Sequence, residues 1–142
     1  MISRNKLIEY TLKGLKETST YTKVIAPFLQ EVGFSDSSLE SIEEDYEVII
    51  NTQRVWIDRC LKIEGSPVAF LQIKRLGCPS LLDSDFKKTM QAARKAAIPT
   101  VILTSGDVWE IYKATKLVCK QNLLNNFDNG ISEIKNWLKL LQ

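Results

Sequence analysis

The chain has 142 residues, 44% hydrophobic and 25% charged, with a formal net charge of +2. This composition predicts one domain, residues 1–142, with enough apolar side chains for a single core. No apolar stretch approaches the roughly 18 residues of a membrane span, and the N-terminus shows no secretory signal. We therefore expect a cytoplasmic protein with no membrane partner.

The residue inventory restricts the chemistry that is available. The chain has no histidine and three widely spaced cysteines, which excludes Ser-His-Asp and Cys-His pairs and argues against structural zinc. It contains no glycine-rich phosphate motif, so neither dinucleotide binding nor a built-in NTP motor is supported. Any hydrolysis must use carboxylates, lysines and a bound metal ion.

The N-terminal segment predicts two helices. Residues 2–17 have the apolar spacing of a helix, whose buried face is predicted to hold Ile8, Leu12 and Leu15. A second helix begins near Ser19 or Thr20 and ends at Gly33. The polar segment 35–45 is predicted to be a loop or a weak helix.

Three strands are predicted next, joined by tight turns: Tyr46–Asn51, Arg54–Lys62 and Val68–Arg75. Strict alternation places Trp56, Asp58 and Cys60 on one face of the second strand, with Ile57 on the other. Because both faces of this hairpin are largely apolar, we expect both to be covered.

The second half predicts a helix, two strands and a closing helix. The helix covers 83–97, the strands are Thr100–Thr104 and Val108–Lys113, and the closing helix contains Ile131 to Leu141. This order predicts an α/β fold with a central mixed β-sheet flanked by helices.

Asp58, Gln72 and Lys74 carry the clearest chemical signal. Gln72 and Lys74 are two residues apart on one strand and share a face, and the hairpin brings Asp58 beside them. A metal-dependent phosphodiester nuclease needs a carboxylate, an amide oxygen and an ammonium of this kind. The competing interpretation is structural, since a lone strand Asp often pairs with a neighbour and a Gln-x-Lys often ends a solvated edge.

Basic residues gather between residues 74 and 95, although the net charge is small. One stripe of the predicted helix 83–97 holds Lys87, Gln91, Arg94 and Lys95. This stripe could contact DNA phosphates, although a charged helix face is usually only solvated. Trp56 could stack on a base, although a tryptophan in a strand more often belongs to the core.

Four stretches, in this order, resemble one known superfamily: ETSTYTKVIAPFLQEVGF (17–34), RVWIDRCL (54–61), PVAFLQIKRLG (67–77) and VILTSGDVWEIYK (101–113). They are similar to the restriction-endonuclease-like superfamily, often written PD-(D/E)XK. Within it, the chain looks most like the N-terminal nuclease domain of type I restriction enzyme R subunits.

The resemblance implies a restriction-endonuclease-like fold and a metal-dependent DNA endonuclease, or a nuclease-fold subunit of a restriction or DNA-processing system. The implied metal ligands are Asp58, Gln72 and Glu17, for Mg²⁺ or Mn²⁺. Lys74 is the implied catalytic lysine, which orients or helps to deprotonate the attacking water. Gln91 corresponds to the family's glutamine on the next helix.

Two departures from the family pattern leave an alternative open. Gln72 replaces an acidic ligand, as in Mrr-type nucleases, and Lys95 stands where related nucleases carry a tyrosine. Both favour a catalytically inactive nuclease-fold module that binds DNA or a partner protein. A carboxylate could compensate for Gln72, with Glu17 first and Glu44 or Glu47 next.

The implied partners are DNA and further protein subunits. Because the chain has no motor motif, any translocation requires a motor subunit, and a specificity subunit is equally compatible with the resemblance. A homodimer is also an option, since these folds often cut two strands as dimers.

Overall fold

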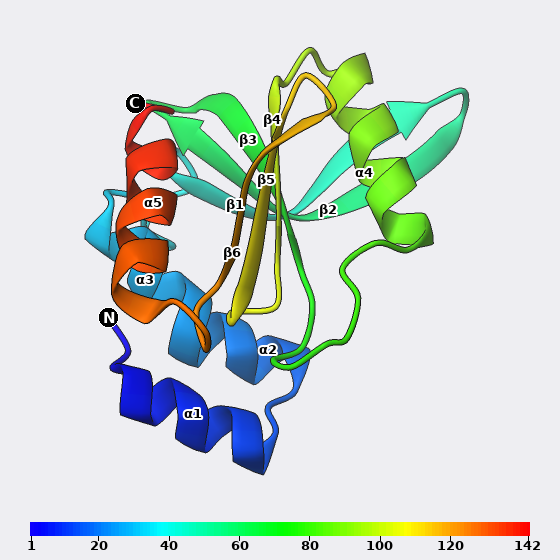
Figure 1. Ribbon diagram of the computed structural model, residues 1–142. Coiled ribbons are helices and arrows are strands. Elements are labelled where there is room, and N and C mark those ends of the chain that lie inside the picture. The colour runs from blue at the N-terminus through cyan, green and yellow to red at the C-terminus, as the bar shows by residue number, and fades with distance from the viewer.

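The computed structural model describes all residues, 1–142, and contains one six-stranded mixed sheet with helices on both faces (Figure 1). The strands lie in chain order: β1 (Ile42–Ile50), β2 (Gln53–Ile63), β3 (Ser66–Ile73), β4 (Thr100–Thr104), β5 (Val108–Lys113) and β6 (Lys116–Asn122). The helices are α1 (Arg4–Lys13), α2 (Glu17–Thr20), the π-helical turn η1 (Tyr21–Ile25), α3 (Ala26–Glu31), α4 (Ser84–Lys95) and α5 (Phe127–Lys139). The predicted α/β architecture is confirmed.

The position of α4 follows from the strand directions. β3 and β4 are parallel, whereas all other neighbouring strands are antiparallel. A parallel pair needs a crossover connection, and α4 supplies it. Figure 1 shows α4 on one face of the sheet, with α1 to α3 and α5 on the other. Each face has its own apolar cluster, of 22 buried residues beneath α1 to α3 and α5 and of 10 beneath α4.

The N-terminal helices differ from the prediction in detail. In α1 the buried residue is Leu7, while Leu12 is 84% exposed. The predicted apolar face was therefore wrong at Leu12, whereas Ile8 is half-buried and Leu15, beyond the end of α1, packs against the larger cluster. The next helical segment starts at Glu17, earlier than Ser19 or Thr20, and ends before Gly33, whose φ is 100°. No helix in the chain is both long and apolar enough to cross a membrane.

Two strand predictions need correction. β1 begins at Ile42, inside the segment expected to be a loop or weak helix. β6, which completes a hairpin with β5, was not predicted. The connecting turn is Ala114-Thr115, with φ values of 47° and 70°. Such turns usually carry Asn or Gly, so this turn lacks the usual sequence signal.

Side-chain alternation in β2 breaks at Asp58. Ile57 and Cys60 both pack in the cluster under α4, although strict alternation puts them on opposite faces. The prediction that Trp56, Asp58 and Cys60 share a face opposite Ile57 was therefore wrong. The cause is local: Asp45, across from Asp58 in the β1–β2 register, has a φ of 50° and interrupts the ladder.

Candidate active site

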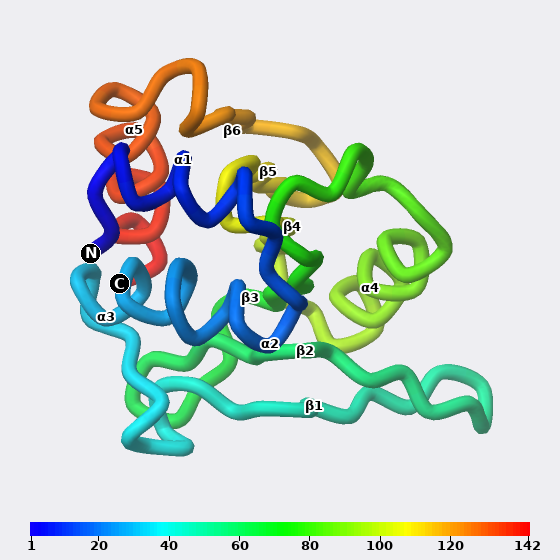
Figure 2. Tube along the Cα trace, turned by 90° about the horizontal axis from the view of Figure 1, so that it is seen from below, coloured from blue at the N-terminus to red at the C-terminus, as the bar shows by residue number.

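The two strands that carry the predicted site residues separate at the site itself. β1 and β2 are paired from Ile42↔Leu61 to Ile50↔Gln53, whereas β2 and β3 are paired only from Arg59↔Leu71 to Ile63↔Ser66. The residues of β2 before Arg59 therefore have no partner in β3. Figures 1 and 2 show the outer part of the β1–β2 hairpin running past α4 as a two-stranded arm. We call the point of separation the fork.

Side chains bridge the backbones where the ladder ends. The Asp58 backbone N–H donates to Oε1 of Gln72 at 3.0 Å, and the Ile73 N–H donates to Oδ2 of Asp58 at 2.8 Å. These bonds satisfy backbone groups that the opening of the fork would leave unpaired. They also fix Asp58 in place and leave its Oδ1 without a hydrogen bond.

The Gln72 amide is occupied on both sides. Its Nε2 donates to Oγ1 of Thr89 at 2.7 Å, and the Thr89 hydroxyl donates to the Asp85 carbonyl at 2.7 Å. Gln72 is 7% exposed. The amide oxygen, predicted as a metal ligand, thus accepts a hydrogen bond from the backbone of β2.

Lys74 forms ion pairs at the start of α4. Its Nζ lies 2.6 Å from Oδ2 of Asp83 and 3.2 Å from Oδ2 of Asp85. Asp83 also caps α4 by accepting from the N–H groups of Asp85 and Phe86. Burial alone would lower the pKa of Lys74, but the bonds to Asp83 and Asp85 outweigh it and raise that pKa. Lys74 is therefore a firmly held ammonium.

An acidic recess of about 170 Å³ lies on one side of the fork. Its lining is Glu17, Thr18, Tyr21, Glu44, Asp45, Asp58, Arg59 and Ile73. Burial and then the charge of Asp58 raise the pKa of Glu17, while Lys74 lowers it. Burial also raises the pKa of Asp58. Of the carboxylates expected to compensate for Gln72, Glu17 and Glu44 line this recess, whereas Glu47 lies 3.6 Å from Arg54 on the arm.

A second recess, of about 220 Å³, lies on the arm side of the fork. It is lined by Arg54, Val55, Trp56, Gln72, Asp85 and Lys88, and we call it the aromatic recess. Gln72 lines this recess and Asp58 lines the acidic one, so the hydrogen bond between them separates two differently built surfaces.

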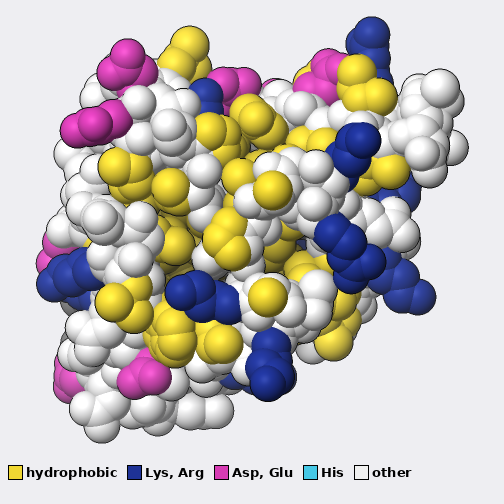
Figure 3. Space-filling view, turned by 90° about the horizontal axis from the view of Figure 1, so that it is seen from above, with side chains coloured by type: hydrophobic (Ala, Val, Ile, Leu, Met, Phe, Trp, Pro, Cys, Tyr) yellow, Lys and Arg dark blue, Asp and Glu magenta, His cyan; other side chains and the backbone are white.

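The predicted DNA-binding stripe lies on the outer side of α4. Lys87, Gln91, Arg94 and Lys95 are all exposed, while Thr89, Ala92 and Ala93 face the sheet. None of the three cationic side chains forms an ion pair. Gln91 makes no hydrogen bond to the fork. Figure 3 shows Lys and Arg side chains together with hydrophobic ones on one face of the molecule.

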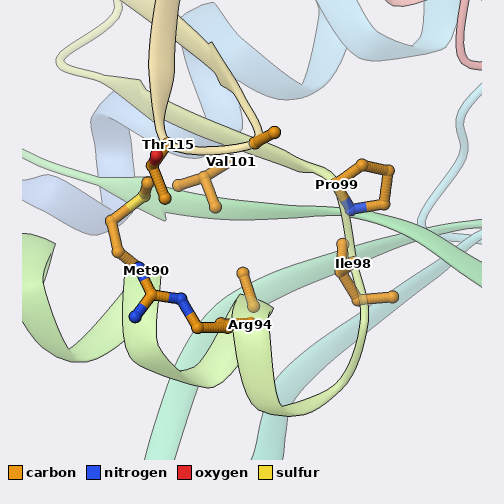
Figure 4. A pocket seen from close by; sticks show the side chains of 8 residues that line it. Met90, Arg94, Ile98, Pro99, Val101 and Thr115 are labelled. Atoms are coloured by element: carbon orange, nitrogen blue, oxygen red, sulfur yellow. The ribbon is translucent and has the colours of Figure 1, made fainter.

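A cavity of about 330 Å³ lies at the other end of α4, away from the fork (Figure 4). Met90 and Arg94 of α4 line it together with Ile98, Pro99 and Val101. Arg94 is the one ionisable side chain in the lining of this cavity, and the lining contains no carboxylate. The cavity therefore lacks the groups needed for hydrolysis. The fork is therefore the candidate active site.

Three residues of the site were not predicted: Asp83, Asp85 and Thr89. An Asp ahead of an apolar helical pattern is a helix-start signal, and it could have identified Asp83 as the cap. Thr89 lies four residues after Asp85 and on the same helix face. Its contact with Gln72 depends on how α4 crosses the sheet, which has no local signal.

Comparison with known proteins identifies a fold. No family model matches the chain, and no curated protein matches it significantly. A cryo-electron microscopy structure of a DrdV–DNA complex is similar, with a TM-score of 0.57 and 11% identity over 96% of this chain. This chain spans only 14% of the DrdV chain. The likeness shows the fold, a mixed sheet flanked by helices that is compatible with a restriction-endonuclease-like architecture.

Proposed function

We propose that this chain is a metal-dependent DNA endonuclease, or the nuclease-fold subunit of a restriction or DNA-processing system, and that it hydrolyses phosphodiesters at the fork. The supporting observation is that Glu17 and Asp58 line one recess, with the Lys74 ammonium near enough to lower the pKa of Glu17. Charged groups have such effects only at short range. DNA is the proposed partner, and the likeness to a protein bound to DNA agrees with it.

The residues of the acidic recess fit a magnesium or manganese ion that is held partly by substrate. No three Asp, Glu, His or Cys side chains are close enough together to hold a metal by themselves. Mg²⁺ in phosphate-processing sites usually keeps water and binds one or two carboxylates plus substrate phosphates. Asp58 and Glu17 supply such a pair. When bound, the ion would activate water and neutralise charge on the phosphate.

Lys74 acts as a fixed positive charge. Because its pKa is raised, it does not accept a proton from water near neutral pH. It instead holds the phosphate and stabilises the negative charge that develops during hydrolysis. Asp83 and Asp85 position it.

The test is cleavage of supercoiled plasmid with Mg²⁺ or Mn²⁺ by wild type, Asp58→Ala and Lys74→Ala. We expect nicking or linearisation by wild type alone. Lys139→Ala is the matched control, because it removes an exposed lysine of α5, outside the fork and outside the predicted DNA-binding stripe. Equal cleavage by wild type and Asp58→Ala would place any nuclease activity elsewhere.

A second candidate is an inactive nuclease-fold module that binds DNA or a partner protein. The engaged amide of Gln72 favours it, as does the lack of three acidic ligands. It predicts DNA binding in a gel shift, with no cleavage by any variant under either metal.

A further inference from the structure

The arm beside the fork is anchored at its base although it extends past the sheet. Its residues in β2 before Arg59 pair only with β1, and Figure 2 shows it projecting beyond α4. A two-stranded hairpin alone is barely stable in water. Here Val48 and Ile57, both buried, attach the inner face of the arm to the cluster beneath α4. The inner part of the arm, next to Trp56, is therefore packed against the body of the protein.

Trp56 is the large side chain that the arm leaves open. It is 52% exposed, whereas Trp109 is fully buried. Trp109 stacks on Phe28, but Trp56 contacts no aromatic ring and no cation of the protein. An indole in a recess, with no partner for its ring, has a face free for a planar ligand.

The charged groups around this indole favour an anion. Lys88 is exposed and makes no ion pair, and the side chain of Arg54 is 68% exposed with one long contact, 3.6 Å, to Glu47. The one carboxylate in the lining, Asp85, is paired with Lys74. The cations beside Trp56 are thus available for phosphate groups, as in surfaces that track a nucleic-acid backbone.

The size of the recess limits its occupant. At about 220 Å³, it is smaller than the roughly 300–1,000 Å³ of a typical small-molecule pocket. A single base can enter and stack on the indole. The bases of a duplex are stacked on one another, so a base that reaches Trp56 must be unpaired.

We propose that the aromatic recess binds one unpaired DNA base on Trp56, with the adjoining phosphates on Arg54 and Lys88. This inference rests on the proposed function and names its substrate class: DNA with a single-stranded stretch or a frayed end. The base lies on one side of the Asp58–Gln72 bond, and the strand continues across the fork to the acidic recess.

The test measures binding of a fluorescent oligothymidylate by anisotropy in EDTA, so that no cleavage is needed. Stacking on an aromatic ring changes affinity by roughly 5- to 150-fold per base. We expect Trp56→Leu to weaken binding by an amount in this range and Trp56→Phe to retain most of it, because leucine keeps apolar surface but not a ring. The control is Ile49→Ala, an exposed apolar residue of β1 that does not line the recess.

The outcomes separate this inference from the proposed function. Binding that depends on a ring at position 56, without plasmid cleavage by wild type, supports the inference and contradicts the proposed catalysis. Cleavage by wild type with equal oligonucleotide binding by Trp56→Leu overturns the inference and leaves the catalysis intact. Tighter binding of a blunt duplex than of the single strand also overturns it, as does an equal loss of binding in Ile49→Ala.

Discussion

The acidic and aromatic recesses share one hydrogen-bonded pair, Asp58 and Gln72, yet they are lined by opposite kinds of side chain. The acidic recess has four carboxylates against one guanidinium, that of Arg59. The aromatic recess has two cations, one carboxylate and the open ring of Trp56. The first surface would repel phosphate and the second would attract it, so under the proposed function DNA binding and hydrolysis would lie on different sides of one fork.

Electrostatics indicates which kind of ligand the acidic recess favours. The pKa values of Glu17 and Asp58 are both raised, chiefly by burial, so the folded protein holds these charges at a cost. A bound divalent cation would stabilise the ionised forms of Glu17 and Asp58 and would let a phosphate approach. The aromatic recess needs no such ion. The difference between the two recesses therefore predicts that removal of the metal ion stops the proposed hydrolysis but leaves DNA binding intact.

The largest effect is expected from Gln72→Glu, which adds a carboxylate to the shared pair. Gln72 is 7% exposed, so in EDTA this substitution should destabilise the fold by about 1–3 kcal/mol. Mn²⁺ should restore part of the loss, because the new carboxylate would replace the amide oxygen that lies beside Asp58, and a ligand that binds only the folded state stabilises it. Thermal unfolding with and without Mn²⁺ measures both effects.

Gln72→Leu is the matched control for this prediction. It also removes the amide bonds but adds no charge, so Mn²⁺ should not rescue it. Equal rescue of both variants, or weaker Mn²⁺ binding by Gln72→Glu than by wild type, would show that position 72 does not face the metal.

Glu17→Gln should reduce cleavage without changing oligonucleotide binding, and should thereby distinguish the roles of the two recesses. If Glu17 holds the metal directly or through water, its loss should reduce cleavage by roughly 10–100-fold, the range for groups that support a metal site. Oligonucleotide binding in EDTA should be unchanged, because Glu17 does not line the aromatic recess. Glu9→Gln, on α1 and exposed, is the control. A parallel loss of oligonucleotide binding and cleavage would contradict the assignment of metal binding to the acidic recess and of DNA binding to the aromatic recess.

Asp58→Asn should stabilise the protein while it inactivates it. The pKa of Asp58 is raised in the fold, so its favourable contribution is present at low pH and is lost as the pH rises through the folded pKa. Asparagine keeps an oxygen for the Ile73 N–H and carries no charge. We expect a melting temperature a few degrees above wild type at neutral pH, with the gap closing near the ordinary pKa of 3.8.

A melting temperature for Asp58→Asn that is equal to or below that of wild type at neutral pH would contradict this account of the site. Stabilisation by loss of a functional charge is a known cost of active sites.

The strands with strong local signals were predicted well. Thr100–Thr104 and Val108–Lys113 have the predicted bounds, because both are apolar runs ended by turn residues. β6 was missed because its hairpin turn, Ala114-Thr115, adopts positive φ without Asn or Gly. Local sequence thus located strands wherever the usual residues marked their ends.

The site was only partly predictable, for a different reason. Hairpin alternation brought Asp58, Gln72 and Lys74 to one end of a strand pair, and the structure places all three at the fork. The break in alternation at Asp58 accompanies the positive φ of Asp45 on the neighbouring strand. The contact between Gln72 and Thr89 depends on how α4 crosses the sheet beside the separation of β2 from β3. That separation is a property of the whole sheet, and no single segment encodes it.

The smallest effect concerns one phosphate contact in the aromatic recess. If Lys88 binds a single phosphate of a single strand, Lys88→Ala should reduce the slope of log affinity against log salt by about 0.7. Lys139→Ala on α5, also exposed, should leave the slope unchanged. Anisotropy titrations of the same oligothymidylate over a range of salt concentrations measure both slopes. An unchanged slope in Lys88→Ala would remove Lys88 from the DNA path and leave Arg54 as the cation beside the stacked base, whereas a change at Lys139 would mean that DNA contacts both faces of the sheet.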